Sequence, residues 1–117
     1  MPIAPVLFEF GTLRLRQGRP ADAEALLREA LAAQETQLGD DHPDTLRTVQ
    51  GLADVHRSLN RLGEAETLLG KTLETQKRVL GEDHPDALSS MHRLATVYQD
   101  QRRFDAAESL YRQALEI

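Results

Sequence analysis

An eight-residue segment that occurs twice limits the possible folds of this chain more than any other feature. Residues 38–45 read LGDDHPDT and residues 80–87 read LGEDHPDA, so the same Gly, Asp, His, Pro and Asp return at an offset of 42 residues. Self-similarity at a fixed period of about 20–50 residues is typical of stacked-repeat proteins, in which each unit buries its apolar face against its neighbours. The sequence therefore favours a binding surface over a catalytic pocket.

The same offset relates residues outside this loop and reveals a third copy of the unit. Ala23, Ala65 and Ala107 coincide under the shift; each is followed by Glu, and Leu stands three and eight residues after it. A recurring alanine indicates a close approach between helices that would exclude a larger side chain. The repeat predicts one domain of three units, at about residues 1–39, 40–81 and 82–117.

The spacing of apolar residues within each unit is helical. Over residues 46–59 they recur mostly every three or four residues, and no segment alternates with the period of two that a half-buried strand shows. Gly39 and Gly81 follow the last apolar residue of one helix, and the loop prolines stand where the next begins. We predict an all-α chain of six antiparallel helices in three hairpins, at residues 5–16, 21–38, 43–58, 63–80, 85–100 and 105–117.

The turn inside each hairpin falls at positions that also coincide under the shift. These residues are Gly18, Asn60 and Arg102. Glycine and asparagine tolerate the left-handed backbone conformation that ends a helix, whereas arginine adopts it less readily.

The composition excludes several classes of function. Charged residues make up 28% and hydrophobic residues 40% of the chain, and the net charge of −5 is spread without a basic run. We expect no nucleic-acid partner, because phosphate binding needs clustered Lys and Arg. No apolar stretch approaches the ~20 residues that span a bilayer, the N-terminus lacks the basic start of a signal peptide, and cysteine is absent. We expect no membrane association and a cytoplasmic location.

The histidines of the repeated loop raise the question of a metal or acid–base site. His42 and His84 stand in equivalent loops of successive units, and no second His or Cys lies at ligand spacing. A structural role is the better explanation, and with Asp41 and Asp83 they are candidates to cap the following helices. No Ser–His–Asp order, Gly-rich phosphate loop or calcium-loop pattern is present. We predict no enzyme activity, no cofactor and no metal site.

The second and third units resemble the tetratricopeptide repeat family, whose pattern places Leu-Gly, Tyr, Ala and Phe at set spacings in a helix–turn–helix. Alanine replaces the first glycine in both units, and the period of 42 exceeds the usual ~34 because the second helix runs on to the repeated loop. This longer unit is similar to that of kinesin light chains. The matching residues of the second unit are Leu52, Ala53, His56, Asn60, Leu62, Ala65, Leu69 and Thr72. Those of the third unit are Leu94, Ala95, Tyr98, Arg102, Phe104, Ala107, Tyr111 and Ala114.

The resemblance implies a right-handed superhelical solenoid whose concave face binds an extended peptide or a helix of a partner protein. The first helix of each unit would build this face, and the chain would serve as a protein interaction module or scaffold. The alternative is that the same side chains are only the solvated face of amphipathic helices. A chaperone-tail receptor is disfavoured, because the Lys and Asn pattern that clamps a C-terminal carboxylate in some relatives is absent. The implied groove residues are Phe8, Thr12, Arg47, Gln50, Asp54, Arg57, Ser89, His92, Thr96 and Gln99.

The last predicted helix carries an apolar stripe that no polar helix follows. Repeat arrays normally close with a polar outer face, so an apolar end favours association. Two explanations compete: the chain is a piece of a longer array, or copies of it pair through this end as a homo-oligomer. We favour the first, with self-association of the isolated piece as its consequence. At the other end, Pro2 and Pro5 interrupt the start of the first helix. The stripe consists of Leu110, Tyr111, Ala114, Leu115 and Ile117.

Overall fold

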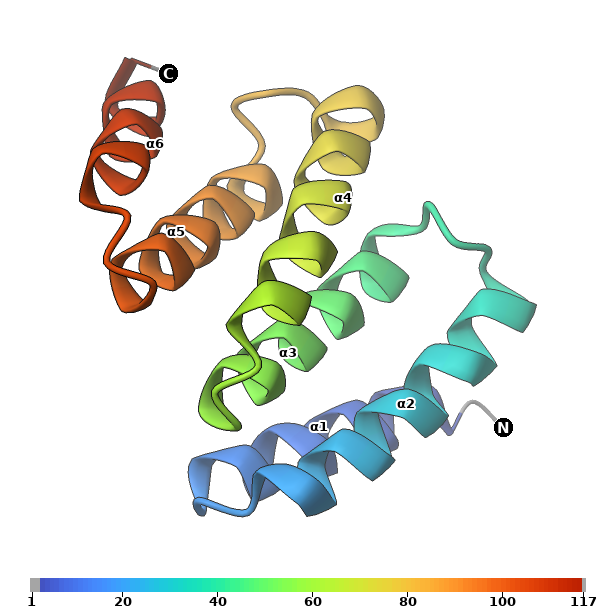
Figure 1. Cartoon of the computed structure of the whole chain (residues 1–117). Coiled ribbons are helices and arrows are strands. Elements are labelled where there is room, and N and C mark those ends of the chain that lie inside the picture. The colour runs from blue at the N-terminus through green and yellow to red at the C-terminus, as the bar shows by residue number, and fades with distance from the viewer. Residues whose placement is uncertain (1–2, 117) are drawn as a thin grey trace.

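The computed structural model describes residues 3–116, and its ordered elements are six α-helices in three antiparallel hairpins (Figure 1). The predicted all-α repeat solenoid is confirmed, and the predicted helix bounds agree with the observed ones to within one residue. The helices are α1 Ala4–Arg16, α2 Pro20–Gln37, α3 Pro43–Ser58, α4 Leu62–Leu80, α5 Pro85–Asp100 and α6 Phe104–Glu116.

The repeated loop begins α3 and α5 through its histidine. His42 and His84 have extended backbone conformations, and the Nδ1 atom of each accepts a hydrogen bond of 3.0 Å from the backbone N–H two residues later. This bond satisfies one of the backbone donors that a helix leaves free in its first turn. The proline that follows stands at the first helical position, where its missing N–H costs nothing. The histidines, rather than the neighbouring aspartates, therefore cap these helices.

Each hairpin turns at a residue with positive φ. Gly18, Asn60 and Arg102 have φ of 73°, 60° and 64°. In each turn the next residue donates its N–H to a carbonyl five residues earlier; Arg103, for example, donates to Tyr98 at 2.8 Å. This bond closes the end of the helix. Arg102 therefore adopts the left-handed conformation that Gly18 adopts without strain at the equivalent position.

Replacing Arg102 by glycine is expected to raise the free energy of unfolding by about 1 kcal/mol, because it removes the left-handed strain of a residue with a Cβ. Urea denaturation checks this value. The reverse exchange at the equivalent turn, Gly18→Arg, is the control and should lower the stability by a similar amount. Equal stability of Arg102→Gly and the parent chain would contradict the assigned strain.

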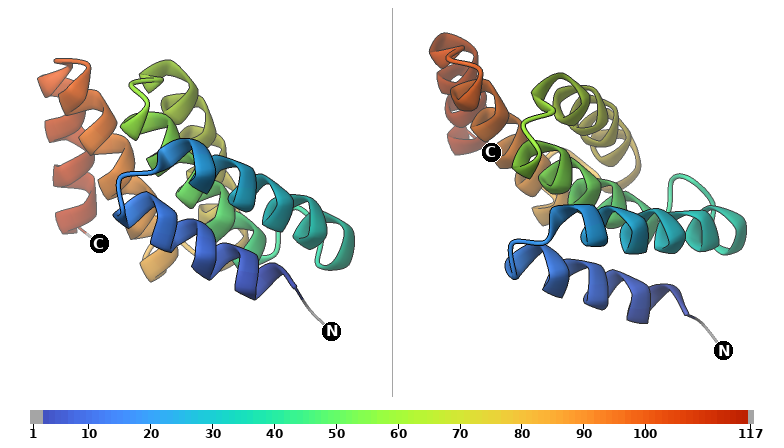
Figure 2. Two further views of the ribbon diagram at one scale, coloured as in Figure 1. Left: turned by 90° about the horizontal axis from the view of Figure 1, so that it is seen from below. Right: turned by 60° about the horizontal axis from the view of Figure 1, so that its bottom comes forward.

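The hairpins stack because α2 and α4 each pack on the first helix of their own hairpin and on the first helix of the next. Helix α2 contacts α1 and α3, and α4 contacts α3 and α5 (Figures 1 and 2). The recurring alanines predicted to mark close helix approaches, Ala23, Ala65 and Ala107, are all buried. Two apolar clusters form the core, one around Leu27 between α2 and α3 and one around Leu69 between α4 and α5. Helices α1, α3 and α5 succeed one another along one layer of the stack.

A ladder of ion pairs joins successive second helices. Glu24 of α2 lies 3.0 Å from Arg61, just before α4, and Glu66 of α4 lies 2.8 Å from Arg103, just before α6. The two pairs occupy equivalent positions of successive units. Burial alone would raise the pKa of the Glu24 carboxyl, but the hydrogen bond from Arg28 and the charge of Arg61 outweigh it and lower the pKa below its usual range.

Candidate functional site

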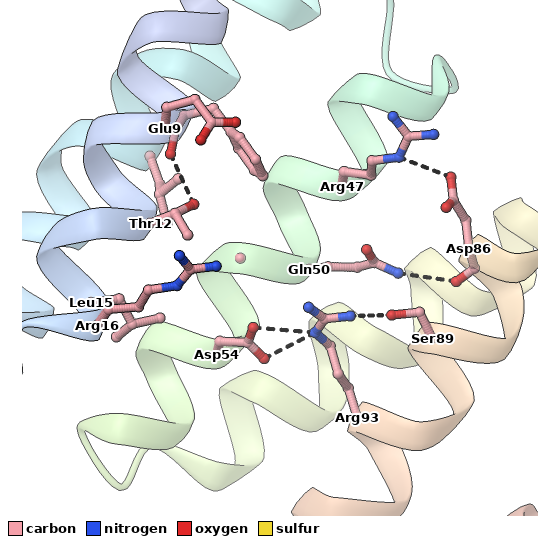
Figure 3. Close-up of a pocket in the computed structure, with 13 residues that line it drawn as sticks. Glu9, Thr12, Leu15, Arg16, Arg47, Gln50, Asp54, Asp86, Ser89 and Arg93 are labelled. Atoms are coloured by element: carbon pink, nitrogen blue, oxygen red, sulfur yellow. Dashed lines mark hydrogen bonds and ion pairs between the residues drawn. The ribbon is translucent and has the colours of Figure 1, made fainter.

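The first helices of the three hairpins enclose a pocket of about 410 Å³ (Figure 3). It lies over the middle of α3, with α1 on one side and α5 on the other. Six of the ten predicted groove residues line it, with side chains from all three helices. These residues are Phe8, Thr12, Arg47, Gln50, Asp54 and Ser89.

The other four predicted residues lie further along the same layer. Arg57, His92 and Thr96 line a neighbouring pocket of about 370 Å³ between α3 and α5, which shares Asp54 with the first. Gln99 lines neither of these two pockets. Its side chain accepts a hydrogen bond of 2.8 Å from the hydroxyl of Tyr111 on α6. The structure thus brings nine of the predicted residues into two adjoining pockets and places the tenth at the α6 end.

Charged side chains join α3 to α5 across the first pocket. Arg47 Nε donates to the Asp86 carboxylate at 3.1 Å. Arg93 Nε donates to the Asp54 carboxylate, also at 3.1 Å, and Arg93 further donates to the Ser89 hydroxyl (Figure 3). These pairs are partly exposed, so each contributes only about 0–1 kcal/mol to stability. Their main effect is to hold two guanidinium groups in fixed positions at the edge of the pocket.

Gln50 has a structural role that its sequence pattern did not reveal. Its side chain is only 5% exposed, and its amide nitrogen donates both to the Asp86 carbonyl at 3.1 Å and to the Ser90 hydroxyl at 2.8 Å. The Ser90 hydroxyl in turn donates to Gln76 Oε1 of α4 at 2.6 Å. Both amide hydrogens of Gln50 are therefore engaged within the chain, and it supports the pocket floor instead of offering free donors to a partner.

Gly51 opens the pocket between α1 and α3. Under the 42-residue offset it takes the position of Glu9 in α1 and Arg93 in α5. Because Gly51 has no side chain, Leu27 of α2 forms the pocket floor there, and a Cβ atom on Gly51 would lie 3.4 Å from Leu27 Cδ1. The ring of Phe8 stands beside it, with its Cε2 3.9 Å from the same point. The result is a slot with apolar walls, which we call the Gly51 slot: Gly51, Leu27, Phe8 and Leu15.

Sequence patterns missed several residues of this site. Arg93 and Asp86 were not predicted, although their offset of 39 residues from Asp54 and Arg47 is the same in both ion pairs and could have identified them. The Gly51 slot was not predicted, because the sequence analysis searched for side chains that could contact a partner and glycine has none. Among residues 3–116, no group of three or more His, Cys, Asp or Glu side chains could hold a metal ion.

The residues predicted for self-association differ in their surroundings. Leu110 and Ala114 are partly buried and pack against the apolar cluster around Leu69. Tyr111 is half-buried, whereas Leu115 is 86% exposed. Ile117 lies outside the described residues.

The helical hairpins, their period and their buried alanines are the features of a known repeat family. The family model described as "Tetratricopeptide repeat" matches residues 3–77 and 48–117 of this sequence, which together cover nearly all of it. The chain belongs to the tetratricopeptide repeat family. This family is a non-catalytic module, and the tetratricopeptide repeat fold generally mediates protein–protein interaction.

Solved structures with tetratricopeptide-type repeats share the fold. A crystal structure of nearly identical TPR-like repeats, described as those of a kinesin light chain from Podosopora anserina, is 28% identical with a TM-score of 0.87, and covers 97% of this chain and 54% of its own. A second structure of those repeats is 27% identical with the same TM-score of 0.87, over 100% of this chain and 57% of its own. The predicted similarity to kinesin light chain repeats is confirmed.

A more distant match supports the fold alone. BtubC (BKLC) from P. vanneervenii is 23% identical with a TM-score of 0.89, over 98% of this tetratricopeptide repeat chain and 45% of its own. The chain spans about half the length of these structures. The comparison with curated protein sequences finds no match. Within residues 3–116, no helix combines the length and apolar character needed to cross a membrane.

Proposed function

We propose that this tetratricopeptide repeat chain binds an extended segment of a partner protein along α1, α3 and α5, and holds one apolar side chain of that segment in the Gly51 slot. The observation that supports this most strongly is the opening that Gly51 leaves above Leu27 in a pocket of about 410 Å³. A pocket of this size accommodates a large apolar side chain. Burying a leucine or phenylalanine side chain contributes about 1.5–3 kcal/mol.

Polar groups around the slot would orient the backbone of the segment. The Asp54 carboxylate and the Thr12 and Ser89 hydroxyls line the same pocket as the Gly51 slot, and Arg16 reaches it from α1 (Figure 3). Backbone N–H and C=O groups of an extended peptide need such partners when they leave water. The bound segment would therefore be fixed by polar contacts along its backbone and selected by its apolar anchor.

The charge of the pocket is balanced, which favours an apolar anchor over a charged one. Three carboxylates line it, from Glu9, Asp54 and Asp86. Three guanidinium groups line it as well. A partner chosen by net charge would require an excess of one sign. The proposed compartment is the cytoplasm, which is where we expect the partner.

Filling the slot is expected to weaken peptide binding by at least about tenfold, which corresponds to the loss of about 1.4 kcal/mol of anchor burial. The change is Gly51→Leu, whose side chain would occupy the slot. The probe is a peptide selected against the parent chain from a phage-displayed random library, and its affinity is measured by isothermal titration calorimetry.

Gly70→Leu is the matched control for this experiment. Gly70 lies inside α4, and a Cβ atom there would meet no atom within 4 Å, so the exchange makes the same change of helix propensity away from the pocket. The selected peptide should bind Gly70→Leu as it binds the parent. Equal affinity for the parent chain and for Gly51→Leu would refute the slot as the anchor site.

A further inference from the structure

The outward face of α1 carries large apolar side chains in contact with solvent. The residues are Ile3, Val6, Phe10 and Leu13, spaced by three and four positions and 40–66% exposed. We call this set the α1 face. Phe10 is partly covered by the Arg14 guanidinium, which lies 4.6 Å from its ring centre. Four exposed apolar side chains on one helix face indicate a surface that another element covers.

The other hairpins show which element covers this face. Shifted by 42 residues, the α1 face falls on four residues of α3 that are at most 2% exposed, and by a further 42 residues on four residues of α5 that are at most 6% exposed. In α3 the two apolar members pack with residues of α2, and in α5 the three apolar members pack with residues of α4. The α1 face therefore corresponds to the surface of α3 and α5 that lies buried where the second helix of the preceding hairpin packs. The equivalent residues are Thr45, Thr48, Leu52 and Val55 in α3 and Ala87, Ser90, Leu94 and Val97 in α5.

Helix α6 presents the complementary surface. Tyr111 and Leu115 are the equivalents of Leu69 and Leu73, which α4 packs against α5. In α6 they line an open hollow of about 610 Å³ with Phe104. The hollow lies where the first helix of a following unit would sit in the same arrangement.

The ion-pair ladder ends with one unmatched member at each end of the chain. In both rungs, glutamate pairs with the arginine 37 residues later, from Glu24 to Arg61 and from Glu66 to Arg103. The next glutamate in the series is Glu108, and the arginine equivalent to Arg61 and Arg103 in the first unit is Arg19. Among residues 3–116, Glu108 pairs with Arg112 at 3.1 Å and Arg19 pairs with Asp22 at 2.6 Å, and neither has an ion-pair partner from another hairpin.

We infer that copies of this chain associate head to tail, with α6 of one copy on the α1 face of the next and Glu108 of one copy paired with Arg19 of the other. The junction repeats the packing of α2 on α3 and of α4 on α5, and it continues the ladder by one rung. It goes beyond groove binding, because it uses the two ends of the stack and leaves the Gly51 slot free. A head-to-tail contact does not close on itself when the rotation continues the solenoid, so the assembly is open-ended.

The mass of the chain in solution tests this inference. Sedimentation velocity from micromolar to millimolar concentration is expected to show a weight-average mass that rises above the 13.1 kDa of one chain and does not stop at a dimer. Val6→Asp should block the α1 face, and Leu115→Lys should block α6. An acid in the first turn and a base in the last turn both favour a helix, so neither change should unfold the chain, which circular dichroism can verify.

A mixture of the two variants distinguishes head-to-tail packing from a symmetric contact. Each variant alone should remain a monomer, whereas the mixture should form a complex of about twice the single-chain mass, because Val6→Asp keeps an intact α6 and Leu115→Lys keeps an intact α1 face. Val79→Asp replaces an exposed valine on α4 and should associate as the parent does. A parent chain that stays monomeric throughout overturns the inference. So does a Val6→Asp protein that still dimerises, or a mixture that does not pair.

Charge reversal tests the added rung. Arg19→Glu or Glu108→Arg alone should weaken association by about two- to fivefold, the range of an exposed ion pair, and the chain that carries both changes should associate as the parent does. Unchanged association of the single variants, or no recovery in the double variant, would refute this contact.

Val6→Asp should bind the selected peptide with parental affinity. The association of copies and the binding of the peptide can therefore each fail in experiment without affecting the result of the other.

Discussion

Replacing Leu27 by alanine is expected to lower the free energy of unfolding by about 2–5 kcal/mol, the range for a leucine truncated in a packed core. Leu27 is 1% exposed and packs in the cluster that joins α2 to α3. It also lies under both α1 and α3, because a Cβ atom on Gly11 would come within 2.8 Å of its side chain and one on Gly51 within 3.4 Å. Its loss would leave a cavity where three helices meet.

Urea denaturation followed by circular dichroism measures this effect. Leu38→Ala is the matched control, because Leu38 is 44% exposed at the end of α2 and its truncation should change the stability by no more than about 0.5 kcal/mol. If Leu27→Ala were as mild as Leu38→Ala, the core would not depend on this residue. The variant should also weaken binding of the selected peptide, because the floor of the Gly51 slot is removed.

Replacing Ser90 by alanine is expected to lower the free energy of unfolding by about 2–4 kcal/mol, because it leaves two buried polar groups without their partner. The hydroxyl is fully buried; it accepts from Gln50 and donates to Gln76. The Gln76 Nε2 atom has no hydrogen-bond partner among the described residues, so this side chain has no other bond to compensate. The three residues tie α3, α4 and α5 together.

Two comparisons isolate this polar network in urea denaturation. Ser58→Ala, on the exposed end of α3, should have almost no effect. Adding Gln76→Leu to Ser90→Ala should cost less than the sum of the single changes, because removing both partners leaves fewer unsatisfied groups. Additive costs would mean that the hydrogen bond between Ser90 and Gln76 contributes little.

The fold was predictable because its determinants are local. Glycine and proline in the repeated loop fix where one helix stops and the next starts, and the apolar spacing fixes which face is buried. Because equivalent positions recur every 42 residues, a feature with a weak signal in one unit can be predicted from the same position in another unit. Arg102 shows this well, since the residue type alone opposes a left-handed turn but its equivalents Gly18 and Asn60 predict one.

The site was predictable only in outline, because it depends on how closely neighbouring helices pack. Helical periodicity places Gln50 on the inner face, but only the approach of α5 shows that its amide is engaged there. The Gly51 slot depends on Leu27, which lies in α2 of the first hairpin. The sequence pattern of α3 alone therefore cannot predict it.

The α1 face was missed for a different reason. Pro2 and Pro5 were expected to interrupt the start of the first helix. The helix α1 begins at Ala4, within one residue of the predicted start, and Pro5 stands in its first turn, where proline is tolerated. An exposed apolar stripe was predicted for the last helix, whereas none was predicted for the first. The α1 face stands out only when its exposure is compared with the burial of the equivalent residues in α3 and α5.

Amide NMR of the isotope-labelled chain, titrated with the selected peptide, tests the proposed groove most directly. The groove predicts that the largest shift changes fall on Thr12, Gly51 and Asp54, which line one pocket, while Gly70 of α4 stays unchanged. Changes confined to α2 and α4, or to the α1 face and α6, with Gly51 unaffected, would contradict it.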